Sequence, residues 1–179
     1  LGVPAVASLF GGELVGLPDI GYGSQLSRMN RWFVRVSLRQ AACVTAGSSY
    51  LRRLAESDGG ARRLESIPIG VDTDIFYPTR EETGSSVLAT GDVKLLHAAS
   101  LVPVKDQATL LRATSRVVQR MPGVHLHILG EGPLRGGLET LAGSLEVRGH
   151  VTFHGAARYE RMPAYYRAAD LCVLSSRHE

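Results

Sequence analysis

The sequence has few cysteines, few aromatic residues and no long hydrophobic run. Its two cysteines, Cys43 and Cys172, lie in apolar segments without metal-type spacing, so we expect buried free thiols, as in a reducing cytosol. No run of about 18 or more apolar residues is present, so no membrane-spanning helix is expected. Aromatic residues make up 6% of the chain and do not alternate with basic runs, which argues against nucleic-acid binding.

The remaining composition is that of a globular protein with a mild basic excess. Hydrophobic residues make up 44% and charged residues 21% of the 179 residues, and the formal net charge is +3. This charge suits an anionic nucleotide or an acidic membrane surface and identifies neither. The spacing predicts a helix from Ser24, with Leu26, Met29, Phe33 and Val36 on one face. Four arginines recur on another face, as a solvated stripe or as a contact for phosphates or membrane: Arg28, Arg31, Arg35 and Arg39.

Short apolar runs alternate with amphipathic helical patterns along the chain. In the second half the runs are Val93–Ser100, Val124–Gly130, His150–Gly155 and Leu171–Ser175, with helices expected near 106–120, 133–147 and 162–169. In the first half, strands are expected at 3–10, 42–46 and 64–69, with a second helix at 50–56. Because each pair of parallel strands needs a helical crossover, the pattern predicts an α/β fold with parallel sheets.

Polar residues follow each strand of the second half. They are Ser100 and Lys105, Gly130-Glu131-Gly132, His154-Gly155, and Arg177-His178-Glu179. Taken singly, each has an ordinary interpretation, such as a solvated lysine, a strand-to-helix turn, a structural histidine or an exposed glutamate. In a parallel sheet, however, these ends share one edge, where helix amino termini present unpaired N–H groups to ligands. Together they predict a site for a phosphate-bearing, hydroxyl-rich ligand.

The glycine segment at 130–136 is not a dinucleotide fingerprint. Arg135 stands where the third glycine of G-x-G-x-x-G belongs, and no acidic residue closes a strand about 20 residues later. A turn without side chains still lets a ligand approach the backbone closely.

Five segments in register resemble glycosyltransferase family 4, whose retaining enzymes have the GT-B architecture of two Rossmann-like domains. Residues 67–78 are similar to I-P-N-G-V-D-x-x-x-F-x-P, with Ile69 replacing the asparagine. Residues 95–105 are similar to V-G-R-L-x-x-x-K, and residues 126–138 match L-x-I-x-G-x-G-P-x-R-x-x-L. Residues 151–155 match V-x-F-x-G, and residues 169–179 match A-D-x-x-V-x-x-S-x-x-E.

The resemblance implies a role for each group of residues. Lys105 would bind the donor's diphosphate; Ser100 stands in place of the arginine that shares this task, and Asp106 in place of a glycine. Gly130, Gly132, His154 and Gly155 would line the nucleotide side of the site. Glu179, which matches the first of two family glutamates, would be the catalytic residue. Gly11, Gly12 and Glu13 would form the loop on the acceptor side, and neither metal nor cofactor is implied.

The same resemblance implies a domain organisation. Residues 1–78 would be the later part of an acceptor-side Rossmann-like domain with the interdomain segment, 79–92 a linker, and 93–179 the first part of the donor domain. The chain starts without a methionine and ends on Glu179 just after an apolar strand, so we interpret it as an internal fragment that is inactive alone.

The implied function is transfer of a sugar, with retention, from a nucleotide-sugar donor to a sugar, lipid-linked or other small-molecule acceptor. We expect it in the cytoplasm, at the inner face of the membrane, with peripheral membrane contact. Two alternatives stay open. One is another GT-B enzyme, such as a nucleotide-sugar epimerase or a phosphorylase, although no clear lysine for pyridoxal phosphate is present. The other is a non-catalytic nucleotide-sugar-binding domain, which Ser100 in place of the arginine keeps open.

Overall fold

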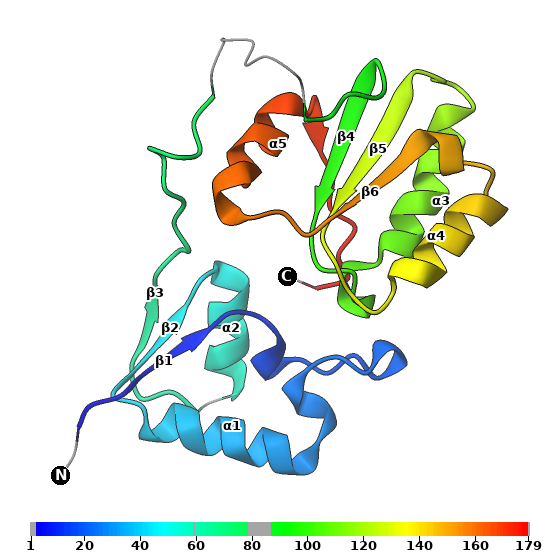
Figure 1. Ribbon diagram of the computed structural model, residues 1–179. Coiled ribbons are helices and arrows are strands. Elements are labelled where there is room, and N and C mark those ends of the chain that lie inside the picture. The colour runs from blue at the N-terminus through cyan, green and yellow to red at the C-terminus, as the bar shows by residue number, and fades with distance from the viewer. Residues whose placement is uncertain (1–2, 59, 79–86, 179) are drawn as a thin grey trace. The chain divides into compact units, whose positions relative to one another are not determined.

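The computed structural model describes residues 3–58, 60–78 and 87–178, and the chain divides into two compact units between Val71 and Asp72 (Figure 1). The linker was expected at 79–92. Residues 79–86 lie outside the described part, and the contacts group 72–78 with the second unit rather than with the first. No helix in the described ranges is long and apolar enough to cross a bilayer.

The first unit is a three-stranded parallel sheet with two helices. Its elements are β1 (Val6–Leu9), α1 (Arg28–Gln40), β2 (Cys43–Ala46), α2 (Ser49–Asp58) and β3 (Leu64–Ser66), with strand order β1-β2-β3. The predicted strands and helices are confirmed. Helix α1 begins four residues after Ser24, because residues 24–26 form a 3-10 turn and the Ser27 hydroxyl accepts a hydrogen bond from the Asn30 N–H. Likewise, the Ser48 hydroxyl accepts from the Leu51 N–H at the start of α2.

The core of the first unit corrects the expected orientation of α1. The buried residues of this core are Leu9, Leu38, Ala41, Val44 and Ala55, with Val34 packed against them. The helix therefore meets the sheet through Val34 and Leu38. The apolar face expected from its spacing lies at the surface instead, with Met29 64% and Phe33 52% exposed.

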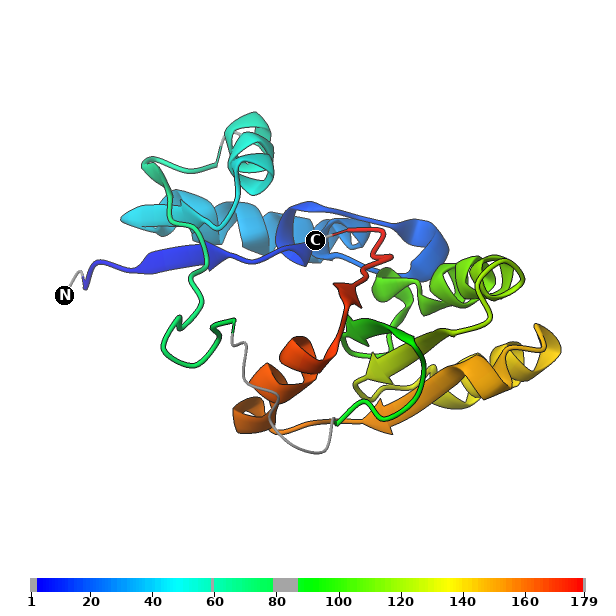
Figure 2. The same ribbon diagram turned by 90° about the horizontal axis from the view of Figure 1, so that it is seen from above.

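The second unit is a four-stranded parallel sheet. Its elements are β4 (Val93–Ala98), α3 (Gln107–Val118), β5 (Val124–Leu129), α4 (Arg135–Ser144), β6 (Val151–Gly155), α5 (Met162–Ala168) and β7 (Leu171–Cys172). The strand order is β6-β5-β4-β7, and every pair is parallel, as predicted. Helices α3 and α4 cover one face of the sheet and α5 lies on the other (Figure 1, Figure 2).

Strand β5 is the centre of the second unit, and all six of its residues are buried. Leu126 and Ile128 belong to the apolar core, together with Leu111 of α3 and Leu138 of α4. The other face of the strand carries two buried histidines, His125 and His127, because side chains alternate along a strand.

Both cysteines are free, but their expected burial is wrong. Cys43 is half-buried and Cys172 is exposed. Strand β7 has only two residues and lies at the edge of its sheet, where Cys172 pairs with Leu96 of β4. An apolar run at an edge resembles a central strand in sequence, although it is covered on fewer sides.

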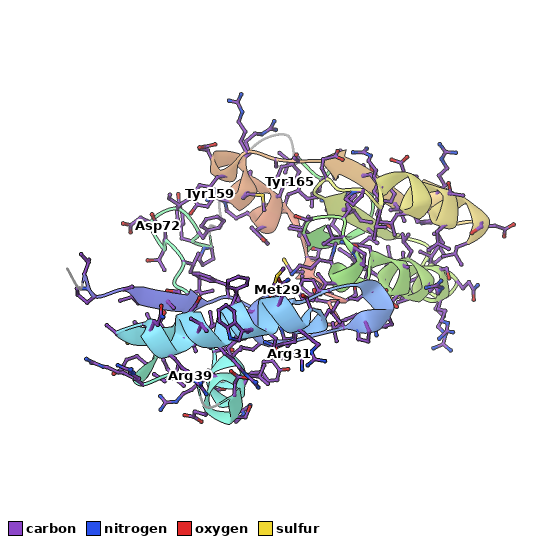
Figure 3. All side chains as sticks on the ribbon, turned by 90° about the horizontal axis from the view of Figure 1, so that it is seen from below. Met29, Arg31, Arg39, Asp72, Tyr159 and Tyr165 are labelled. Atoms are coloured by element: carbon purple, nitrogen blue, oxygen red, sulfur yellow. The ribbon has the colours of Figure 1, made fainter. Side chains whose placement is uncertain are left out.

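Residues 72–78 are attached to α5 through aromatic contacts. The Phe76 ring lies 5.5 Å from that of Tyr159 and 6.1 Å from that of Tyr166, both edge to face. The Arg167 guanidinium lies 5.0 Å from the centre of the Tyr77 ring. Figure 3 shows Asp72 at the start of this segment and Tyr159 on the neighbouring turn. The segment therefore belongs structurally to the second unit.

Candidate functional site

The carboxyl ends of the second unit's strands are joined by hydrogen bonds between their loops. The Gly130 N–H donates to the Gly155 carbonyl at 2.8 Å, and the Leu101 N–H to the Glu131 carbonyl at 2.9 Å. On the other side of β4, the Arg177 N–H donates to the Val104 carbonyl at 2.8 Å. The structure thus brings the loops after β4, β5, β6 and β7 to one edge of the sheet, as the parallel topology predicted.

Lys105 ends a 3-10 turn that leads into α3. The turn spans Pro103–Lys105, and Asp106 follows with a φ of 44° and a ψ of 48°. This left-handed conformation suits glycine better than aspartate, which accounts for the glycine in the pattern that the segment resembles. The Asp106 carboxylate accepts hydrogen bonds from the N–H and the hydroxyl of Thr109, at 3.3 and 2.9 Å. Asp106 therefore caps α3 and places a negative charge beside Lys105.

Gly130 and Gly132 let two loops come into close contact. A Cβ atom on Gly130, whose φ is 143°, would overlap the carbonyl oxygen of Ala99. One on Gly132 would overlap the carbonyl oxygen of Leu101 and lie 2.8 Å from its carbonyl carbon. The space that a side chain would fill is thus taken by the loop after β4. Both glycines are required for this packing, and their role toward a nucleotide stays a prediction.

Gly155 lies under an ion pair from the loop after β5. Its φ is 78°, and a Cβ atom there would lie 2.9 Å from Oε1 of Glu131. That carboxylate pairs with the Arg135 guanidinium, whose Nε also donates to Glu139 at 2.9 Å. A side chain at position 155 would displace this cluster of charges, so glycine is needed there for a structural reason.

His154 is part of a hydrogen-bonded pair of histidines on the α5 side of the sheet. Its Nε2 lies 3.0 Å from Nδ1 of His127, whose Nε2 lies 3.0 Å from the Thr90 carbonyl. These partners assign an Nε2–H to both rings. Burial lowers the pKa of both, so both are neutral at pH 7. The His154 ring also lies 5.6 Å from that of Tyr165, labelled on α5 in Figure 3. Its expected place beside a nucleotide stays a prediction.

Two buried polar side chains that the sequence did not single out connect these loops. Gln107, the first residue of α3, is 1% exposed and donates from Nε2 to the Ser100 carbonyl at 2.9 Å. The same amide lies 3.2 Å from Nε2 of the fully buried His97, whose Nδ1 lies 2.9 Å from the Val173 carbonyl. One buried pair thus joins the loop after β4, the start of α3 and the segment after β7. The one sequence signal that could have indicated it is His97, a lone histidine inside the apolar run of β4.

The loop after β1 in the first unit is stabilised by hydrogen bonds to the carboxylate of Glu13, which belongs to the same loop. The Glu13 carboxylate accepts hydrogen bonds from the N–H groups of Gly11 at 2.8 Å and Phe10 at 3.4 Å. A Cβ atom on Gly12 would lie 2.9 Å from the Tyr22 hydroxyl oxygen. Gly11, Gly12 and Glu13 form a compact turn, and their role on the acceptor side stays a prediction.

Two further expectations concern the catalytic residue and metals. Glu179 lies outside the described residues. Within the described ranges, no group of three or more histidine, cysteine, aspartate or glutamate side chains is arranged to hold a metal ion. This edge carries Lys105, backbone N–H groups and Arg177, which can act as hydrogen-bond donors to an anionic ligand.

The chain matches a known family and several characterised proteins. The family model described as glycosyl transferases group 1 matches residues 79–179. The chain is 37% identical over 138 residues to a GDP-mannose-dependent alpha-(1-6)-phosphatidylinositol monomannoside mannosyltransferase of Mycobacterium tuberculosis, covering 75% of this chain and 36% of that protein. It is 33% identical over 141 residues to a D-inositol 3-phosphate glycosyltransferase of Nocardia farcinica, covering 72% and 31%. The chain thus spans about a third of the length of these relatives.

Solved structures show the same fold. TarM of S. aureus, in a complex that includes UDP, is similar with a TM-score of 0.78 and 15% identity over 98% of this chain and 33% of its own. Anabaena HepE, in complex with UDP and glucose, has a TM-score of 0.75 and 22% identity over 97% of this chain and 46% of its own. These likenesses show the α/β fold with parallel sheets of GT-B glycosyltransferases.

Proposed function

From the premise that the chain belongs to the glycosyl transferases group 1, glycosyltransferase family 4, we propose that it serves sugar transfer from a nucleotide-sugar donor. The observation that carries the proposal is the carboxyl edge of the second sheet, where Lys105 and the loops after all four strands are joined. The leaving nucleoside diphosphate gains negative charge in the transition state. A fixed lysine and N–H groups at a helix start would stabilise that charge.

The relatives suggest which donor and acceptor to test first. The M. tuberculosis relative is named for GDP-mannose and a phosphatidylinositol mannoside, and the N. farcinica relative for an inositol phosphate. We propose GDP-mannose as the first donor and a lipid-linked or polyol acceptor. Because TarM and HepE were solved with UDP, UDP-sugars are the second choice.

Binding of nucleoside diphosphates to the full-length protein tests the donor site. Lys105→Gln is expected to weaken GDP or UDP binding about tenfold or more, because a hydrogen bond to a charged group contributes roughly 1.5–3 kcal/mol. The matched control is Lys94→Gln, since the sequence has only these two lysines and Lys94 lies at the amino end of β4. Isothermal titration measures both. Binding that is absent, or equally strong in both variants, would contradict the proposal.

Glu179 remains our candidate for the catalytic residue. A carboxylate at the end of the segment after β7 would hydrogen-bond the sugar hydroxyls or stabilise the positive charge that develops at the anomeric carbon. Glu179→Gln is expected to lower kcat strongly and to change nucleoside diphosphate affinity little. An unchanged kcat would show that another group performs this role.

The alternatives that the sequence left open are separated by one assay. A transferase forms a glycosylated product only when the acceptor is present, whereas an epimerase converts the nucleotide sugar alone. A non-catalytic binding domain would bind the nucleotide and turn over nothing.

We propose that the first unit, with its Gly11–Glu13 turn, binds the acceptor.

The four arginines of α1 are not equivalent. The Arg35 guanidinium pairs with Asp58 at 3.2 Å, and that of Arg31 donates to the Gln25 carbonyl at 3.3 Å. Both are therefore engaged with the first unit itself. The other two, Arg28 and Arg39, are exposed at opposite ends of the helix.

We propose that α1 makes the expected peripheral contact with an anionic bilayer at the cytoplasmic face of the membrane. Met29, Trp32 and Phe33 are 64%, 60% and 52% exposed, which is unusual for three large apolar side chains on one helix. Arg28 and Arg39, of which Arg39 is labelled in Figure 3, add the positive charge that anionic headgroups attract. The lipid acceptor in the name of the M. tuberculosis relative supports the idea.

The single tryptophan makes this contact measurable. Adding phosphatidylglycerol vesicles is expected to shift Trp32 fluorescence to the blue, whereas phosphatidylcholine vesicles should not. Arg28→Gln with Arg39→Gln should weaken the effect. An unchanged spectrum would mean that this face meets protein rather than lipid.

A further inference from the structure

The loop between β4 and α3 carries no net charge of its own. Over residues 99–106 its only cation is Lys105, and the carboxylate of Asp106 follows directly. Ser100 supplies a hydroxyl without charge. Each phosphate of a nucleotide sugar is negative, and the leaving diphosphate gains further charge during transfer. A donor site built on this loop therefore needs a second cation close to Lys105.

The segment after β7 runs alongside β4 and this loop, and it is held to them at three successive points. The Val173 N–H donates to the Leu96 carbonyl at 2.9 Å. Next, the Ser175 hydroxyl donates to the carbonyl of Lys105 itself at 2.9 Å, and the Arg177 N–H donates to the Val104 carbonyl at 2.8 Å. The buried ring of His97 adds a fourth bond, to the Val173 carbonyl. The backbone at 177 is thus fixed beside the residue that precedes Lys105.

We propose that Arg177 is the second phosphate-binding cation of the donor site. Its guanidinium keeps its charge at all relevant pH values and presents N–H groups in a planar fork that fits phosphate oxygens. The residue is exposed, and its backbone is hydrogen-bonded to the turn that carries Lys105. The loop after β4 and the segment after β7 each contribute one cation to the same edge. The inference rests on the proposed function.

The competing explanation is a solvated surface arginine, and nucleotide binding by the full-length protein separates the two. Arg177→Gln removes the charge at similar length, and Arg177→Lys keeps the charge without the fork. Arg116→Gln is the matched control, because Arg116 is also exposed but lies in the last turn of α3, at the opposite end of that helix from Lys105. The ligands are GDP and UDP, each compared with guanosine or uridine, which lack phosphates.

The expected result is specific to the phosphates. Arg177→Gln should weaken binding of the diphosphate about tenfold or more and reduce its dependence on salt, while nucleoside binding stays unchanged. Arg177→Lys should lie between this variant and the wild type, and Arg116→Gln should match the wild type.

Two results would overturn the assignment while leaving the proposed function intact. Diphosphate binding that Lys105→Gln weakens but Arg177→Gln does not would show that Arg177 does not bind the phosphates. Equal losses for the diphosphate and for the nucleoside would show that Arg177 acts on the shape of the loop. Failure of the wild type to bind any nucleoside diphosphate is a different outcome, because it removes the proposed function and this inference with it.

Discussion

The glycine loops of the two units look alike in sequence but are built differently. In the first unit, Gly11 and Gly12 precede Glu13, whose carboxylate accepts hydrogen bonds from the N–H groups of its own turn. In the second unit, Gly130 and Gly132 flank Glu131, and the space beside each glycine is filled by backbone carbonyls of the loop after β4.

The difference shows what each set of glycines is for. In the first loop, the Glu13 carboxylate occupies N–H groups that an anionic ligand would otherwise use, and the Gln25 side chain donates to the Glu13 carbonyl at 2.9 Å. An anion could bind there only after Glu13 moved away. The second loop joins two strand ends, so its glycines hold the edge that carries Lys105 in shape. Similar glycine-rich turns thus have different roles. The first is stabilised within itself by Glu13, and the second packs two loops together at the edge that carries Lys105.

The sharpest way to break this comparison is to add a methyl group to each loop. Gly132→Ala is expected to destabilise the second unit by about 3 kcal/mol or more, because the new Cβ meets backbone atoms that cannot move independently. Gly12→Ala should cost about 1 kcal/mol, since its neighbour is the tip of the Tyr22 side chain. Gly136→Ala in α4, with nothing within 4 Å, should stabilise slightly. Urea midpoints measure all three, and equal costs at 12 and 132 would refute the distinction.

The next largest effect is expected from acidic pH, which should destabilise the second unit more than the first. All six histidines lie in the second unit, where burial and the neighbouring His127, His150 and His154 lower the pKa of His125 to about 4. In the unfolded chain its pKa is about 6.5, so between pH 6.5 and 4 the unfolded state binds more protons. Relative to acidic solution, the neutral ring therefore stabilises the fold above pH 6.5, and this contribution, about 3 kcal/mol, is lost as the pH falls toward 4.

Hydrogen exchange at a series of pH values measures this effect for each unit. Protection should fall first in β5 and β6, while β1 and β2, which carry no histidine, should keep theirs. Replacing His125 with glutamine should flatten the pH dependence of the second unit. A parallel loss of protection in both units would show that the histidines do not set the acid limit.

Much of the fold followed from the sequence because turn residues interrupt its apolar runs clearly. Strand β5 was predicted to within a residue, since Met121-Pro122-Gly123 precedes it and Gly130 follows. The buried face of α1 could not be predicted. That helix carries apolar residues on two sides, and only the position of the sheet selects Val34 and Leu38 over the larger Phe33.

The candidate site was predictable in its place but not in its connections. Parallel topology alone puts Lys105 and the glycines at one edge, because all carboxyl ends of such a sheet point the same way. The bond from Gln107 to Ser100 and the contact with His97 depend on how three loops meet. No spacing rule links a strand residue to the first residue of the next helix, so the lone His97 inside an apolar run carries the only signal.

Removing the acid of the first loop is expected to have a smaller effect. Glu13→Gln keeps one acceptor for the Gly11 N–H but loses the charge that strengthens both hydrogen bonds. The free energy that stabilises this turn should therefore fall by about 1 kcal/mol. Hydrogen exchange at Phe10 and Gly11 should quicken, and the second unit should be unaffected. Unchanged exchange at these two positions would mean that the turn does not need the Glu13 carboxylate. These N–H groups would then be available to an anion without loss of the turn.

The smallest effect is expected at the turn beside Lys105, where two opposing terms nearly cancel. Asp106→Gly loses the bonds to Thr109, which cap α3 and contribute about 1 kcal/mol, but it relieves a left-handed backbone that costs an ordinary residue a similar amount. The variant should therefore lie within about 0.5 kcal/mol of the wild type. Asp106→Ala loses the cap and keeps the strain, so it should fall below both by about 1–2 kcal/mol. If the urea midpoints of the glycine and alanine variants coincide, the backbone at 106 stores no strain. This turn would then resemble the Gly11–Glu13 turn of the first unit more than the close contact at Gly132.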